Sequence, residues 1–184
     1  MIPFQRIVVI GVTGSGKTTF ARAVAAQLGY PYVEMDALHW LPNWTEKPTD
    51  AFRADIAQAL SSESWVIDGN YSKVRDIVWS RADAVIWLDY PLPLILWRLT
   101  RRTVSRILSK EVLWNDNRES LRNQFRRDSL FVWAFQSYGK QQRTYPALFQ
   151  QPEPEYQHLT FIRLRTPHAA ENWLKNVERK SARS

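Results

Sequence analysis

The residues from Gly11 to Thr18 have the composition and spacing of a phosphate-binding loop. They read Gly-Val-Thr-Gly-Ser-Gly-Lys-Thr and fit the pattern G-x-x-x-x-G-K-[ST]. In such a loop the backbone N–H groups point inward and bind anions at a helix N-terminus. The lysine meets the β- and γ-phosphates, and the Thr hydroxyl is a ligand for Mg²⁺. We therefore predict ATP and Mg²⁺ as cofactors. The predicted cofactor-binding residues of the loop are Gly11, Thr13, Gly14, Ser15, Gly16, Lys17, Thr18 and Thr19.

Further chemically active side chains follow other apolar runs. Asp36, His39 and Trp40 come after the apolar run 32–35, and Asp68, Asn70 and Tyr71 come after 65–67. A loop histidine is more often a hydrogen-bonding or surface residue than a ligand for substrate. The aromatic rings could stack on a substrate ring or simply pack the loop.

Alternating apolar runs and helical periods predict an α/β fold with three layers. Five parallel strands would form the sheet, and helices would cover both of its faces. We expect a single domain over residues 1–184, with 92–150 as a helical, lid-like insertion between the fourth and fifth strands. The predicted strands are 6–10, 32–35, 65–67, 84–88 and 159–164. The predicted helices include 17–28, 49–60 and 74–79, and a last one that contains Ala170, Trp173 and Val177. A Gly-rich turn that only links a strand to a helix is the alternative for residues 11–18. The order of strand, loop, Lys-Thr and helix argues against it.

Composition narrows the class of protein. There is no cysteine among the 184 residues, which excludes disulfides and thiol catalysis. No apolar run of about 18 residues and no signal peptide is recognisable, so we expect a cytoplasmic protein without a membrane partner. Most of the formal charge of +7 comes from residues 98–128, which hold nine Lys or Arg and four Asp or Glu. A phosphate-rich ligand would explain this segment, and a solvated basic helix face is the alternative.

With these residues in view, the chain resembles P-loop kinases of the adenylate kinase and shikimate kinase type. It is more closely similar to the bacterial topology modulation proteins, also called adenylate kinase-like proteins. They share its Asp-x-Leu-His-Trp, Asp-Gly-Asn-Tyr and Asn-Arg-Glu-Ser-Leu-Arg stretches. The resemblance covers nearly the whole chain and implies ATP-dependent phosphoryl transfer to a nucleotide or a small hydroxylated metabolite.

The resemblance also implies roles for single residues. Asp68, in the Asp-Gly that ends a strand, would support Mg²⁺ through its water shell, and Asp89 after the fourth strand is the competing residue. Arg98 would pack against adenine, and Arg102 would reach the phosphates. As catalytic residues, Lys17 would hold ATP with the loop amides and Mg²⁺, and Arg102 with one or more of the insertion arginines Arg122, Arg126 and Arg127 would stabilise the charge of the transition state.

Two departures from adenylate kinases point to an acceptor other than AMP. Asp68-Gly69-Asn70-Tyr71-Ser72 stands in place of the adenylate kinase Asp-Gly-Phe-Pro-Arg, so the arginine for a monophosphate is missing, and Arg75 is a loose substitute. Asp36 stands where shikimate kinase-like enzymes place an acid beside the substrate hydroxyl, and could orient a hydroxyl or accept its proton.

The predicted substrate residues are Asp36, His39, Trp40, Asn70, Tyr71 and Arg75. The rival interpretation is an ATP-controlled nucleic-acid-binding protein, which the basic insertion favours and the lack of a recognisable nucleic-acid module disfavours. A plain NTPase is a further alternative. The sequence makes no prediction about oligomeric state.

Overall fold

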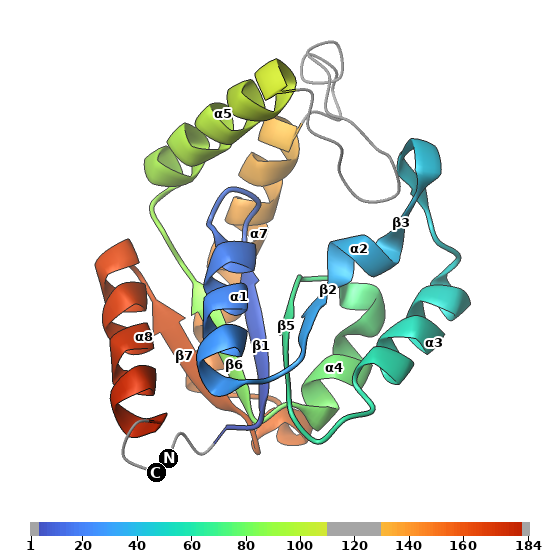
Figure 1. The fold of residues 1–184 in the computed structure, drawn as a ribbon, viewed down its shortest axis with the longest axis vertical. Coiled ribbons are helices and arrows are strands. Elements are labelled where there is room, and N and C mark those ends of the chain that lie inside the picture. Colours follow the sequence, from blue (N-terminus) through green and yellow to red (C-terminus); the bar gives the residue numbers. More distant parts are fainter. Residues whose placement is uncertain (1–3, 110–129, 182–184) are drawn as a thin grey trace.

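The computed structural model of the protein describes residues 4–109 and 130–181 (Figure 1). Five strands form the main sheet: β1 (Arg6–Gly11), β2 (Tyr32–Glu34), β5 (Trp65–Asp68), β6 (Ala84–Leu88) and β7 (Thr160–Leu164). The α-helices are α1 (Lys17–Leu28), α2 (Met35–His39), α3 (Thr49–Ala59), α4 (Arg75–Arg81), α5 (Leu92–Ser109), α7 (Leu130–Gln150) and α8 (Pro167–Ser181). A two-stranded hairpin, β3 (Trp40–Leu41) and β4 (Thr45–Glu46), lies beside α2 in Figure 1.

The strands of the main sheet are all parallel and lie in the order β2-β5-β1-β6-β7. Strand β1 is thus central, and β5, which precedes Asn70, lies directly beside it. In parallel sheets the carboxyl ends of the strands meet at one edge, where ligands of α/β proteins bind. The predicted five-stranded parallel sheet with helices on both faces is confirmed.

Alternate residues of β1 enter two separate cores. Val8 and Ile10 face one core, which α3, α4 and the C-terminal part of α7 cover. Ile7 and Val9 face the other, which α1, α5 and α8 cover. A strand buried on both faces needs apolar residues at every position, and this explains the continuous apolar run of β1.

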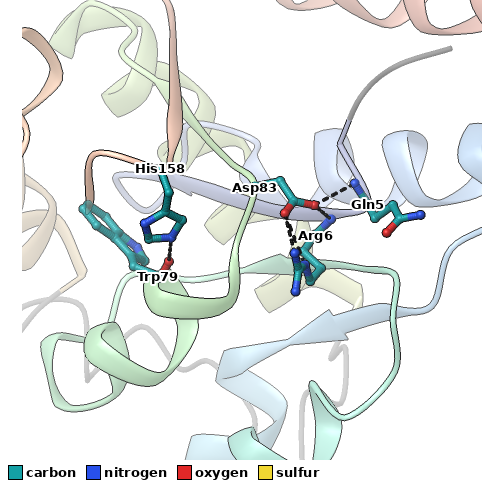
Figure 2. A network of polar contacts seen from close by, with 5 residues as sticks. All are labelled: Gln5, Arg6, Trp79, Asp83 and His158. Carbon is teal, nitrogen blue, oxygen red and sulfur yellow. Dashed lines mark hydrogen bonds and ion pairs between the residues drawn. The ribbon is translucent and has the colours of Figure 1, made fainter. Parts of the chain in front are cut away.

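At the amino edge of the sheet, Asp83 ties β1 to the start of β6 (Figure 2). Its carboxylate accepts hydrogen bonds from the backbone N–H groups of Gln5 (2.9 Å) and Arg6 (2.8 Å). The Arg6 guanidinium donates two more, from Nε at 3.2 Å and from Nη2 at 2.7 Å. These bonds lie at the opposite edge of the sheet from the Gly11–Lys17 loop, because the strands run parallel away from them. In the same view, the ring of His158 bonds the Trp79 carbonyl oxygen at 3.2 Å.

Residues 35–46 differ from the loop that the sequence analysis describes after the second strand. Met35–His39 forms one helical turn, α2, and the following residues form the small β3–β4 hairpin. Met35 and His39, four residues apart, are both buried on the same side of this turn. Tertiary burial therefore stabilises a helix that is too short to be stable by itself.

Candidate active site

The Gly11–Lys17 loop has the backbone shape that its glycines permit. Gly14 and Gly16 have φ angles of +84° and +89°, in the left-handed region that side chains with a Cβ seldom adopt. A Cβ on Gly14 would lie 2.9 Å from the backbone oxygen of Ile95 in α5. The loop therefore needs glycine there for two reasons, its conformation and the close approach of α5.

Two arginines of α5 hold the same loop. Arg98 donates from Nη1 to the carbonyl oxygen of Ser15 at 3.1 Å, and its guanidinium lies over the Tyr90 ring at 5.3 Å. Arg102 donates from Nη2 to the Thr13 hydroxyl at 3.3 Å. The two predicted arginines are thus brought to the loop, one helical turn apart on one face of α5. An open cavity of about 520 Å³ continues along this face, lined by Trp97, Arg98, Arg101, Arg102, Ser105 and Arg106.

The buried carboxylate of Asp68 lies against the first turn of α1. Its Oδ2 accepts a 2.6 Å hydrogen bond from the Thr18 hydroxyl, and its Oδ1 accepts a 2.8 Å bond from the Tyr32 hydroxyl. Burial raises the pKa of Asp68, and the charge of Lys17 with the two hydroxyl donors opposes this shift. The pKa of Tyr32 is also raised, by burial and then by the Asp68 charge, so this hydroxyl keeps its proton and donates.

The competing carboxylate, Asp89, has other partners. Arg163 on β7 bonds its Oδ2 from Nε at 2.8 Å and from Nη2 at 2.7 Å. The Gln142 amide donates to its other oxygen. Both oxygens of Asp89 are therefore engaged away from Thr18, whereas Asp68 contacts the Thr18 hydroxyl directly.

The donor set beside the loop is suited to a small hard cation. Thr18 and Asp68 offer a hydroxyl and a carboxylate, and Mg²⁺ binds through oxygen, commonly with few protein ligands plus substrate phosphates and water. Over residues 4–109 and 130–181, no three His, Cys, Asp or Glu side chains gather in a group that could hold a metal.

A second cluster lies at the same edge of the sheet. Glu34 of β2 pairs with Asp68 of β5, so the segments that carry Asp36 and Asn70 leave the sheet at the same edge. The Tyr71 hydroxyl donates to Asp36 Oδ1 at 2.5 Å and is itself hydrogen-bonded to the Trp40 side chain. Because an indole N–H can only donate, the Tyr71 hydroxyl accepts from Trp40 and donates to Asp36.

His39 supports this cluster from within the protein. It is 2% exposed and packs against the rings of Trp40, Phe52 and Tyr71, with centroids 4.4 to 4.9 Å apart. Burial lowers its pKa, and this effect outweighs the opposing charge of Glu46, whose carboxylate lies 3.8 Å from Nε2. The imidazole is thus neutral at pH 7, and it is buried against Trp40 and Tyr71 rather than lying on the surface.

Asn70 is held from the far side by helix α7. The hydroxyl of the buried Tyr145 donates to Asn70 Oδ1 at 2.7 Å and accepts a 3.3 Å bond from Arg75 Nη2. The Arg75 guanidinium lies over the rings of Trp79 (5.0 Å) and Tyr145 (5.8 Å). The Asn70 side chain is thus anchored through its carbonyl oxygen, and its amide N–H groups can only donate.

Not every predicted residue can be placed. Arg126 lies outside the described residues, as do Arg122 and Arg127. Lys17 is half-buried at the start of α1, and Thr19 is exposed in the first turn of the same helix. The role of 92–150 as a lid stays a prediction, although α5 and α7 fall within that range.

Sequence reasoning missed two residues of the site, Tyr32 and Tyr145. A buried tyrosine usually has a partner for its hydroxyl, and both positions lie in apolar surroundings that would signal such a need. The identity of the partner depends on which strands are neighbours, and no local pattern reveals this.

Sequence comparisons relate the chain to known proteins. A family model described as "ATPase family associated with various cellular activities (AAA)" matches residues 7–89. The shikimate kinase of Synechococcus elongatus is 30% identical over 131 residues, which are 60% of this chain and 69% of that protein.

Solved structures show the same fold. A shikimate kinase from Acinetobacter baumannii, in complex with shikimate, has a TM-score of 0.54 at 17% identity, over 95% of this chain and 91% of that one. A gluconokinase from Sinorhizobium meliloti 1021 has a TM-score of 0.51 at 20% identity, over 97% and 91% of the two chains. No described helix is long and apolar enough to cross a membrane. These matches give only weak support to the closer resemblance to topology modulation proteins. The chain belongs to the P-loop kinases of the shikimate kinase and gluconokinase type.

Proposed function

We propose that the protein transfers the γ-phosphoryl group of ATP to a hydroxyl of a small metabolite. The observation that carries this proposal is the Asp36 carboxylate, held by Tyr71 at the same sheet edge as the phosphate loop. The charge of Asp36 also acts on Asp68, so the acceptor and metal sides of the site are electrostatically in reach of each other. Two similar proteins, a shikimate kinase and a gluconokinase, are named after hydroxylated metabolites of this class.

The donor side would be formed by the loop amides and Lys17, which hold the β- and γ-phosphates. The cation would be held by Thr18 with support from Asp68. A Mg²⁺ ion held there would neutralise charge on the phosphates. Arg102 would stabilise the charge that develops on the transferred group, because its guanidinium already reaches the loop at Thr13. Arg98 would keep the loop in shape through Ser15 and present its outer face to the adenine.

On the acceptor side, Asp36 would receive the proton that the substrate hydroxyl loses. Its Oδ1 is occupied by Tyr71, so Oδ2 would face the substrate. The acceptor oxygen attacks phosphorus in line, the bond from phosphorus to the β,γ-bridging oxygen breaks, and ADP leaves. Asn70 would donate to a second substrate hydroxyl. His39, Trp40 and Tyr71 would form the wall behind Asp36, and Arg75 would contribute through Tyr145.

The proposal is tested by ADP release from ATP with shikimate, D-gluconate and a panel of other hydroxylated metabolites. We expect one of them to raise ADP release well above the rate of protein with ATP alone. Asp36→Asn should lower turnover about 100-fold or more, the range of general base catalysis. Asp50→Asn, a change of an exposed carboxylate on α3, is the matched control and should leave turnover unchanged.

Lys17→Ala should remove ATP binding and ADP release while the far-ultraviolet circular dichroism stays that of the wild type. A screen in which no hydroxylated compound accelerates ADP release would refute the acceptor half of the proposal. Strong ADP release without any acceptor would instead favour a plain NTPase.

A further inference from the structure

We propose that Tyr32 is a positioning residue for the metal site, because it fixes the orientation of the Asp68 carboxylate that supports Thr18. This inference rests on the metal part of the proposed function. It assigns a role to a side chain of β2 that does not itself reach the phosphates.

Both oxygens of the Asp68 carboxylate are engaged by hydroxyl donors from different elements. Thr18 of α1 occupies Oδ2 at 2.6 Å, and Tyr32 of β2 occupies Oδ1 at 2.8 Å. A carboxylate with one engaged oxygen can still turn about its Cβ–Cγ bond. With two donors on opposite oxygens, turning would break both bonds at once.

The orientation matters because of what it does to the Thr18 hydroxyl. This group has one proton and two lone pairs. Since Asp68 takes the proton, the lone pairs are left for a cation at the end of the phosphate loop. If the carboxylate turned away, the Thr18 proton would be free to point at the metal position and repel an ion there.

The rest of β2 holds the Tyr32 ring in place. The Arg22 guanidinium of α1 lies 5.3 Å from the ring centroid and bonds Glu34 at 3.0 Å. Glu34 follows Tyr32 on the same face of β2, and its register partner is Asp68 itself. These contacts form a continuous series from the edge strand to the proposed metal ligand: Glu34, Arg22, Tyr32, Asp68 and Thr18.

The hydrogen bond from Tyr32 also explains why the Asp68 carboxylate can be buried. The side chain is 2% exposed, and a buried carboxylate with an empty oxygen is costly. Tyr32 satisfies the oxygen that Thr18 cannot reach. Partners of this kind around metal sites typically change metal affinity by about 10- to 100-fold when they are removed.

The test measures nucleotide and metal binding, not turnover. Titration calorimetry with AMP-PNP, an ATP analogue that does not transfer its phosphate, gives one Kd in Mg²⁺ and one in EDTA. For the wild type we expect tighter binding in Mg²⁺. For Tyr32→Phe, which keeps the ring and removes the hydroxyl, we expect the ratio of the two Kd values to fall about tenfold. The Kd in EDTA should stay the same.

Tyr30→Phe is the matched control, because it makes the same change two residues earlier, and no hydrogen bond of its hydroxyl to Asp68 is present. A second test uses Asp68→Asn as background. If Tyr32 acts through Asp68, adding Tyr32→Phe to that variant should change the Mg²⁺ dependence no further.

Three results would overturn the inference. An unchanged ratio in Tyr32→Phe would show that Thr18 and Asp68 keep their arrangement without the tyrosine. An equal loss of affinity in Mg²⁺ and in EDTA would show a general structural effect. A wild type whose affinity does not respond to Mg²⁺ would remove the metal part of the proposed function and this inference together. Failure to find an acceptor affects neither measurement.

Discussion

Replacing Asp83 with asparagine should lower the free energy of unfolding at pH 7 by about 2 kcal/mol. The carboxylate accepts two backbone and two guanidinium hydrogen bonds, and bonds to charged groups contribute about 1.5–3 kcal/mol each when fully buried. Side chains of Arg6 and Asp83 are 38% and 23% exposed, so solvent weakens each contribution. Asparagine also keeps one carbonyl for the backbone donors. For a chain of this size, about 2 kcal/mol corresponds to a fall in Tm of about 4–8 °C.

The effect should depend on pH in a defined direction. Burial by itself raises the pKa of Asp83, but the bonds from Arg6 and Gln5 outweigh it, so the folded value lies below the ordinary one. A lowered carboxyl pKa stabilises the folded state fully above the unfolded value, about 3.9, and the stabilisation is lost as pH falls through the folded value. Wild type and Asp83→Asn should therefore differ fully above about pH 4, and the difference should shrink as pH falls from there through the folded value.

Urea unfolding followed by tryptophan fluorescence, at pH 7 and in steps down to pH 3, measures both effects. Glu63→Gln, an exposed carboxylate in the turn before β5, is the control and should change stability by less than about 0.5 kcal/mol. AMP-PNP should bind Asp83→Asn as it binds the wild type, since Asp83 lies at the opposite edge from the phosphate loop. A stability difference that is absent at pH 7, or that persists undiminished at the lowest pH, would refute the reasoning.

Three further predictions concern the site. Gly14→Ala should abolish measurable AMP-PNP binding, because of the +84° φ angle and the 2.9 Å approach to the Ile95 oxygen; wild-type affinity in calorimetry would contradict this. Tyr71→Phe should reduce kcat about tenfold or more by freeing Asp36, with the KM for ATP unchanged; a change in that KM alone would speak against the assigned role. Because the pKa of His39 is lowered in the folded state, wild-type stability should fall as pH drops below about 6.5. His39→Gln should show a flatter dependence in the same urea titration, and equal slopes would count against a neutral buried imidazole.

The fold could be predicted from the sequence because its signals are local. The continuous apolar runs of β1 and β6 indicate strands buried in a parallel sheet. The Gly-rich loop between β1 and α1 indicates the same arrangement. The α2 turn could not be predicted, since its stability comes from burial of Met35 and His39 against residues distant in the sequence. No local pattern predicted the short β3–β4 hairpin either.

For the site, the sequence predicted which residues carry chemistry but not how they pair. Asp68 and Asp89 are both preceded by apolar strands, and the sequence alone left them as competitors. The strand order decides their surroundings: β5 lies between β1 and β2, whereas β7 brings Arg163 to Asp89. Contacts such as Tyr145 with Asn70 join residues 75 positions apart, so they depend on tertiary structure that no short pattern encodes.

Helix α7 contributes buried residues to both cores, and no other described helix does so. Its Ala134 is buried in the core beside α1 and α5, and its Tyr145 is buried in the core on the other face of the sheet. Ala134 and Tyr145 belong to the same helix, so we expect a change in the packing of α7 on α5 to displace the Tyr145 hydroxyl as well. Helix α7 thus connects the packing of α5, which carries Arg98 and Arg102, with the hydrogen bond from Tyr145 to Asn70 on the other face of the sheet.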